Sequence, residues 1–143
     1  MRLLAAAQTL FARHGYDGAT MQMLGARVGI AKPSILHHFS SKRRLYGAVL
    51  EGIAGRIASE MQPPAADRAH PLGQVHAVLD QLLRWARKNP EDLTVILRDL
   101  LDRQPEHVPP EPRAFAAITR RLSTPFAAAR AAGTLHGWDP DVL

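Results

Sequence analysis

The sequence predicts an all-α protein of about seven helices, in which a three-helix amino-terminal domain is joined by a long helix to a helical second lobe. Apolar residues recur at helical spacing along most of the 143-residue chain. Gly29 and Pro33 separate two short helices by a tight turn, since glycine favours a helix end and proline a helix start. Residues 1–57 carry eight Lys/Arg against two acids, whereas residues 58–143 carry ten against eleven. These features predict two units with different surfaces.

Residues 2–14 form the first expected helix, which Gly15 should end. Two short helices and the start of a third follow over residues 18–46. Thr20 is expected to cap the first of them, because its hydroxyl can accept a hydrogen bond from a free amide of the first turn. Gly29 suits the left-handed position that ends this helix. The apolar faces are Leu3, Leu4, Ala7, Leu10 and Phe11 in the first helix and Met21, Leu24 and Val28 in the second.

The helix that begins at Lys32-Pro33 has one apolar and one polar face. Ile35 and Phe39 share the apolar face with Leu36 at its edge, while the polar residues point away. Two helices that meet through a glycine-containing turn, the second with an exposed polar face, are the arrangement of a DNA-binding helix-turn-helix.

Lys42-Arg43-Arg44 places three cations at the start of the next helix. The helix dipole disfavours each cation there by about 0.3–1 kcal/mol when no anion is nearby. The same helix end offers free N–H groups that suit a phosphate. An anionic partner therefore explains the cluster better than folding does, although a solvated basic turn is the alternative.

The segment FARHGYDGATMQMLGARVGIAKPSILHHFSSKRRLYGAVLE resembles the amino-terminal domain of the tetracycline-repressor (TetR/AcrR) family of transcriptional regulators. The resemblance is specific over residues 3–57. It implies phosphate contacts from Thr20, His37 and Lys42, to which the cation cluster adds Arg43 and Arg44. It implies base contacts from Gln22, Lys32, Pro33 and Ser34. Three departures are Ala31 in place of a capping serine, Leu36 in place of a frequent tyrosine and Ser40 in place of a frequent proline or lysine.

The family also implies double-stranded operator DNA as a partner, a homodimer and a small-molecule inducer. In the family the second lobe continues into two long helices that form the dimer interface, and this sequence ends before them. Asp139-Pro140 resembles a helix start with three residues after it. We therefore expect the lobe, residues 47–143, to be incomplete at its carboxy terminus, and residues 1–46 to be the DNA-binding domain.

Composition excludes several classes of protein. With no cysteine, the chain has no disulfide scaffold or thiolate chemistry, and it fits a reducing cytoplasm. No apolar run approaches the roughly 20 residues of a membrane span, and no signal peptide is visible at Met1. The net charge of +5 suits nucleic acid but would also suit an acidic membrane.

Four further helices are expected after the helix-turn-helix, over residues 42–61, 72–88, 91–103 and 113–132. The first is long enough to link the two units, and residues 62–71 and 105–112 should be a linker and a loop. Arg98/Asp102 and Asp99/Arg103 are spaced as ion pairs on the outer face of the third. The fourth should kink at Pro125 and end at Gly133. The expected buried residues are Leu45, Val49, Leu50, Ile53, Ile57 and Met61; Leu72, Val75, Leu79, Leu82, Leu83 and Ala86; Leu93, Ile96, Leu97, Leu100 and Leu101; and Phe115, Ile118, Leu122, Phe126 and Ala129.

The remaining chemistry is sparse. The histidines lack acidic partners at metal-ligand spacing, and no nucleotide-binding or hydrolase motif is present, so we predict no metal, no cofactor and no enzyme. Gaps between bundle helices are common ligand sites. The candidates in the second lobe are His76, Trp85, Arg98, His107 and Phe115. The alternative is that Trp85 and Phe115 belong to the core and that His76 is a surface residue.

The sequence thus predicts a cytoplasmic, dimeric, ligand-responsive DNA-binding repressor. Two other classes stay open: a helical interaction module whose basic lobe binds a membrane or an acidic protein, and a small-molecule-binding protein without DNA binding.

Overall fold

The structure, a computed structural model, describes residues 2–61, 71–101 and 113–134. The described residues form seven helices and no strand, so the predicted all-α fold is confirmed. The helices are α1 (Arg2–Gly18), α2 (Met21–Val28), α3 (Lys32–His38), α4 (Lys42–Glu60), α5 (Pro71–Lys88), α6 (Pro90–Leu101) and α7 (Arg113–Ala131). The predicted linker over residues 62–71 lies outside the described residues except for Pro71, which begins α5. The predicted loop over residues 105–112 and the Asp139-Pro140 helix start also lie outside them.

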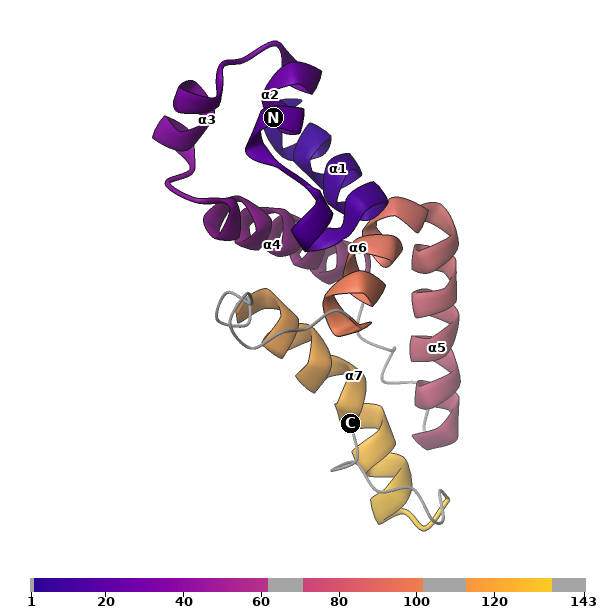
Figure 1. The fold of residues 1–143 in the computed structure, drawn as a ribbon. Coiled ribbons are helices and arrows are strands. Elements are labelled where there is room, and N and C mark those ends of the chain that lie inside the picture. Colours follow the sequence, from indigo (N-terminus) through magenta and orange to yellow (C-terminus); the bar gives the residue numbers. More distant parts are fainter. Residues whose placement is uncertain (1, 62–70, 102–112, 135–143) are drawn as a thin grey trace.

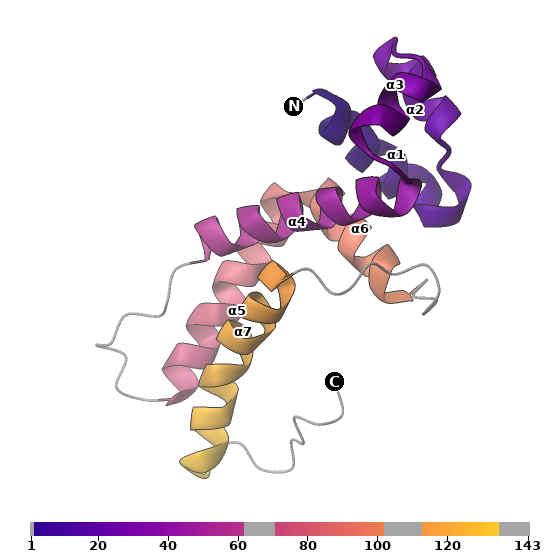
Figure 2. The ribbon, with the colours of Figure 1, turned by 90° about the vertical axis from the view of Figure 1, so that its left-hand side faces the viewer.

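Helix α4 connects the two ends of the molecule. Figure 1 shows α1, α2 and α3 gathered around its first half, and Figure 2 shows α5 and α7 running side by side away from its other end. The residues of the predicted apolar stripe of α4 are all buried: Leu45, Val49, Leu50, Ile53, Ile57 and Met61. One continuous helix therefore belongs to both units, as predicted.

The core of the first domain comes from the predicted faces of α1 to α4. Gly15 adopts a left-handed φ of 68° and breaks the helical path of α1, as its sequence position predicts. Leu24 and Ile35 are almost fully buried, and Leu45 packs with them in the same cluster. Burial of side chains of this size contributes about 1.5–3 kcal/mol each, so these residues anchor α2 and α3 in the core that they share with α4.

The prediction for α6 is wrong for three of its five expected core residues, while Leu93 and Ile96 pack against the core as partly buried side chains. Leu97, Leu100 and Leu101 were expected in the core but are 47%, 62% and 83% exposed. The buried face of α6 instead carries Asp92 and Val95, which are 3% and 1% exposed. Helical periodicity predicts that the leucine-rich face turns inward, but here polar partners on α1 and α4 select the other face.

Those partners surround the Asp92 carboxylate. Arg56 on α4 binds it with two hydrogen bonds, from Nε to Oδ2 and from Nη2 to Oδ1, both 2.8 Å. Gln8 on α1 donates from Nε2 to Oδ1 at 2.6 Å and accepts from Arg56 Nη2 at 2.7 Å. The hydrogen bond to Asp92 raises the pKa of Arg56. This Gln8–Arg56–Asp92 network joins three helices, and it explains how a buried carboxylate is tolerated.

Two further polar contacts fix α6 against the first domain. Tyr46 Oη donates to Asp99 Oδ1 at 3.0 Å, and Arg98 Nη2 donates to the Arg13 carbonyl at 3.4 Å. Arg98 and Asp99 therefore face the first domain, whereas the sequence predicted that they form ion pairs on the outer face of the helix. Their expected partners, Asp102 and Arg103, lie outside the described residues.

Helix α5 also departs from its predicted stripe. Val75 is buried as expected, but Leu79 and Leu83 are 41% and 63% exposed. Trp85, which the stripe omitted, is buried and belongs to the core cluster. The apolar stripe is therefore rotated about the helix axis by the packing of α5 against α7 and α6.

Helix α7 follows its predicted local pattern. Pro125 lies inside the helix, and Gly133 closes it with a left-handed φ of 69°. Ala129 is buried as predicted and Phe126 is partly buried. The expected burial of Phe115, Ile118 and Leu122 concerns side chains outside the described set.

The network predicts a specific loss of stability for Asp92→Asn. The amide removes the charge from two Arg56 hydrogen bonds and turns one acceptor atom into a donor. Since Arg56 is 43% exposed and can regain water, we expect a loss of about 2 kcal/mol in the free energy of unfolding. Urea unfolding followed by circular dichroism measures it.

Glu91→Gln is the matched control, because Glu91 lies in the same first turn and is exposed. It loses only its interaction with the helix dipole, about 0.5 kcal/mol. Equal losses for the two variants would contradict a structural role for the network.

Candidate nucleic-acid interface

The turn between α2 and α3 is built from local signals that the sequence predicted. Thr20 caps α2, its Oγ1 accepting from the Met23 amide at 3.1 Å. Gly29 ends α2 in the left-handed conformation with a φ of 71°. Ala31 provides no side-chain cap to α3, so the weak start expected from its sequence position is present. Because the Thr20 cap uses the oxygen as acceptor, its hydroxyl proton can still be donated outward.

Gly25 is a residue that sequence analysis missed. The Ile30 amide donates to the Gly25 carbonyl at 3.0 Å, and a Cβ added to Gly25 would lie 2.6 Å from the Ile30 carbonyl oxygen. The chain after α2 thus turns back directly against the helix at this point. A glycine inside a helical pattern is the available sequence signal, since such a glycine often marks a close approach of backbones.

Helix α3 presents its polar face to solvent. Ile35 is fully buried, and Leu36 and Phe39 are partly buried, as predicted. The predicted base-contacting residues on α2 and α3, and the predicted phosphate contact at the end of α3, are all exposed: Gln22, Lys32, Pro33, Ser34 and His37. These side chains therefore lie on the accessible surface of two helices that pack against each other.

The start of α4 lies beside this surface. Ser41 caps the helix, its Oγ accepting from the Arg44 amide at 3.2 Å. The first turn of a helix leaves backbone N–H groups without intrahelical acceptors. Arg43 and Arg44 are exposed. Cationic side chains and helix N–H groups thus occur together at this end of α4, which is a favourable place for a phosphate.

Two contacts hold the side chain of Lys42 in place. Its Nζ lies 4.4 Å from the centre of the Tyr16 ring and donates to the Asp17 carbonyl at 3.3 Å. Burial raises the pKa of the Tyr16 hydroxyl, while the nearby Arg43 opposes that rise. The contact with the aromatic ring fixes the position of the ammonium group at the junction of α1 and α4.

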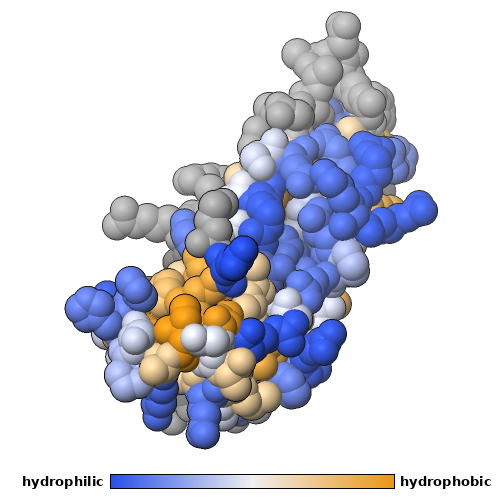
Figure 3. All heavy atoms as spheres, turned by 90° about the horizontal axis from the view of Figure 1, so that it is seen from above, coloured by the Kyte–Doolittle hydropathy of each residue, from blue (hydrophilic) through white to orange (hydrophobic). Residues whose placement is uncertain are grey.

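A hollow of about 880 Å³ opens between the end of α3 and the start of α4. Figure 3 looks down on the end of the molecule that carries α2 and α3, where hydrophilic side chains surround one group of hydrophobic side chains. The hollow is lined by His37, His38, Phe39, Ser40, Ser41, Arg43, Arg44 and Gly47. Cations, hydroxyls and imidazoles that converge on one concave surface suit the sugar-phosphate backbone of a nucleic acid.

Comparison with known proteins agrees with this geometry. Residues 3–49 match the family model described as bacterial regulatory proteins, tetR family. The chain is also 43% identical over 56 residues to the HTH-type transcriptional repressor AcnR of Corynebacterium diphtheriae, an alignment that covers 39% of this chain and 30% of that repressor. The amino-terminal domain belongs to the tetR family.

Solved structures extend the likeness beyond the tetR-family domain. A tetR-family regulator from Shewanella sp. PV-4 superposes with a TM-score of 0.75 at 22% identity, over 98% of this chain and 74% of that one. AibR, in a complex with isovaleryl coenzyme A and operator DNA, superposes with a TM-score of 0.74 at 23% identity, over 99% of this chain and 77% of that one. At these identities the likeness establishes the fold alone.

The chain spans only 30% to 45% of the length of the curated relatives it matches. Among the described residues, no helix has the length and apolar character needed to cross a membrane. Within the same ranges, no group of three or more His, Asp or Glu side chains is placed to hold a metal ion.

Of the five predicted ligand-binding residues outside the tetR-family domain, the structure describes the side chains of three, and their role in binding a ligand stays a prediction. His76 is exposed, Trp85 is buried, and Arg98 points toward α1. His107 and the side chain of Phe115 lie outside the described set. The periodicity of α5 and α6 did not specify which faces meet, so it could not identify a shared pocket.

Gly25→Ala is expected to destabilise the tetR-family domain. The new methyl group would lie 2.6 Å from the Ile30 carbonyl oxygen, so the turn backbone must move, at a cost of about 1–3 kcal/mol. Thermal unfolding of the full chain measures it.

Gly55→Ala provides the control, because a Cβ at this helical position of α4 meets no atom within 4 Å. That change should be neutral or stabilising by up to about 1 kcal/mol. If both variants gained stability, the close approach at Gly25 would be refuted.

Proposed function

We propose that this chain is a sequence-specific DNA-binding regulator of transcription, acting as a repressor that responds to a small ligand. The observation that carries the proposal is the joint exposure of the polar face of α3 and the basic start of α4 in a tetR-family domain. The name of the matched relative AcnR, a transcriptional repressor, supports the direction of regulation. The proposal assigns no catalytic step, and it places the protein in the cytoplasm.

In this proposal α3 enters the major groove and α4 begins at the phosphate backbone. Base contacts fall to Gln22, Lys32, Pro33 and Ser34, and phosphate contacts to Thr20, His37, Lys42, Arg43 and Arg44. Serine and glutamine offer adaptable donors and acceptors to base edges, whereas the cations read no sequence and set the register.

The oligomer proposed is a homodimer. Two copies would place their recognition helices about 34–36 Å apart in successive major grooves. Residues 1–46 would act as the reading domain and residues 47–143 as the lobe that receives the ligand and forms the dimer.

The proposed route of regulation runs through α6. A ligand that shifts α6 must also move the groups bonded to Asp92 and Asp99, which belong to α1 and α4. Because α2 packs against α1 and the basic part of the reading surface belongs to α4, a small shift would change the spacing of the two reading domains in a dimer. The ligand can shift the equilibrium between the two positions of α6 only by as much as its affinities for them differ.

Replacing single cations distinguishes contacts to phosphates from contacts to bases. Arg44→Ala is expected to weaken binding to all duplexes alike and to reduce the slope of log affinity against log salt by about one unit. Lys32→Ala is expected to reduce the preference for a selected duplex over a scrambled one by about tenfold, the effect of losing one base contact. Fluorescence anisotropy at several salt concentrations measures both quantities.

The control is Arg87→Ala, which removes an exposed cation of the second lobe and changes the net charge equally. It should leave affinity and salt slope near those of the parent chain. A helical interaction module without DNA binding would show no salt-dependent affinity for any duplex in any of these proteins.

A further inference from the structure

The indole N–H of Trp85 is an unexplained polar group in the core of the second lobe. Trp85 is 3% exposed, and its Nε1 is fully buried without a hydrogen-bond partner among the described residues. A buried donor left unpaired destabilises the folded state. Native structures rarely keep such a group unless a water or a ligand completes it.

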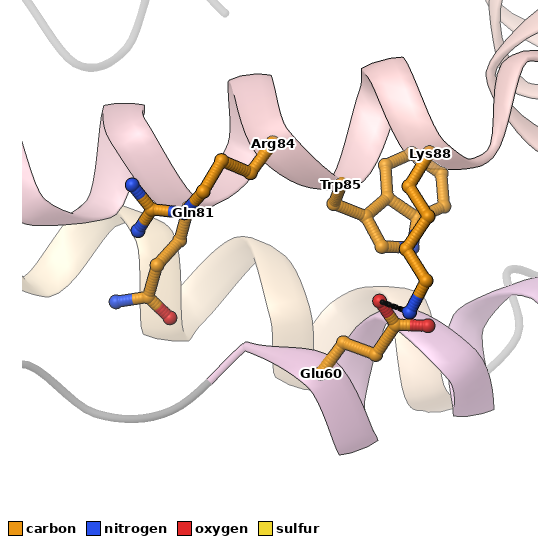
Figure 4. Close-up of a pocket in the computed structure, with 5 residues that line it drawn as sticks. All are labelled: Glu60, Gln81, Arg84, Trp85 and Lys88. Atoms are coloured by element: carbon orange, nitrogen blue, oxygen red, sulfur yellow. Dashed lines mark hydrogen bonds and ion pairs between the residues drawn. The ribbon is translucent and has the colours of Figure 1, made fainter.

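The indole lies at the edge of a hollow of about 370 Å³ between the end of α4 and α5. Figure 4 shows Gln81 and Arg84 at one end of this hollow and Trp85 at the other, next to Lys88 and Glu60. Three of the five lining side chains can only donate hydrogen bonds, and two of those carry a positive charge. The hollow therefore favours an acceptor with negative charge.

An exposed ion pair lies next to the indole (Figure 4). Lys88 Nζ pairs with Glu60 Oε2 at 3.1 Å, and the two side chains are 69% and 33% exposed. An exposed ion pair of this kind contributes little to stability. A ligand can therefore separate it at small cost, and Lys88 then becomes available as a second cation, at the opposite end of the hollow from Arg84.

We propose that this hollow binds a small organic carboxylate with a short apolar chain. One carboxylate oxygen accepts from Trp85 Nε1–H, Arg84 and Lys88 balance the charge, and the apolar chain lies on the indole and on the methylene stems of Gln81 and Arg84. The inference rests on the proposed function only in giving the second lobe a ligand, and it names the chemical class of that ligand.

The indole N–H resonance tests the proposal directly. The chain has two tryptophans, and a Trp138→Phe variant assigns the remaining ¹H–¹⁵N indole cross-peak to Trp85. Hexanoate should shift this cross-peak downfield in a saturable way, because a charged acceptor completes the donor, while hexanol at equal concentration should not. No shift with hexanoate, or equal shifts with both probes, would overturn the proposal.

Two substitutions test whether hexanoate binds in this hollow. Arg84→Gln should weaken hexanoate binding about threefold, as loss of one partly exposed charge pair predicts, whereas Arg87→Gln, outside the hollow, should not. Trp85→Phe should weaken it by about tenfold or more, and Arg84→Gln keeps the test valid if that core variant unfolds. Equal effects of Arg84→Gln and Arg87→Gln would exclude this site.

The outcome is separable from that of the proposed function. If hexanoate fails while the chain still binds duplex DNA, only the carboxylate site is refuted. If hexanoate binds while no duplex does, the site stands and the proposed function is refuted.

Discussion

The buried carboxylate of Asp92 is the constraint on which the arrangement of the two units depends. An isolated carboxylate at 3% exposure would be strongly destabilising, so its position is stable only while Gln8 and Arg56 hold it. Those two residues come from α1 and α4, and Asp92 from the first turn of α6. The carboxylate thus fixes the second lobe against the domain that carries the candidate DNA-binding surface.

A second, aromatic contact set supports the same junction. The rings of Phe11 and Tyr46 meet edge to face with centroids 4.9 Å apart, and those of Tyr16 and Tyr46 do so at 5.1 Å. Tyr46 also donates a hydrogen bond to Asp99 on α6, and the ammonium group of Lys42 lies over the ring of Tyr16. The basic start of α4 and the far lobe therefore share one packed cluster, which gives the proposed regulation a physical route.

The sequence was sufficient where structure depends on neighbouring residues. The Thr20 cap, the left-handed Gly29 and the buried Ile35 follow from rules that act within one or two helical turns, and the structure confirms them. The exposure of the candidate DNA-contacting side chains also agrees with the predicted polar face of α3. Their role in binding DNA remains a prediction.

Periodicity failed where distant partners decide. Leu97 and Leu100 are apolar at core spacing, yet α6 turns Asp92 inward because acceptable partners lie 36 and 84 residues away in the chain. The local sequence pattern contains no information about pairings between residues so far apart in the chain. Periodicity likewise could not show that Trp85 and Arg98 lie on faces that meet different helices.

The central claim is that α2, α3 and the start of α4 bind DNA. Backbone amide exchange of the full chain, with and without a duplex enriched by selection, tests this claim most directly. The account predicts that the duplex slows exchange in α2, in α3 and in the first turn of α4, at low ionic strength and with strong dependence on salt. Protection confined to α5, α6 or α7, or no protection by any duplex, would contradict it.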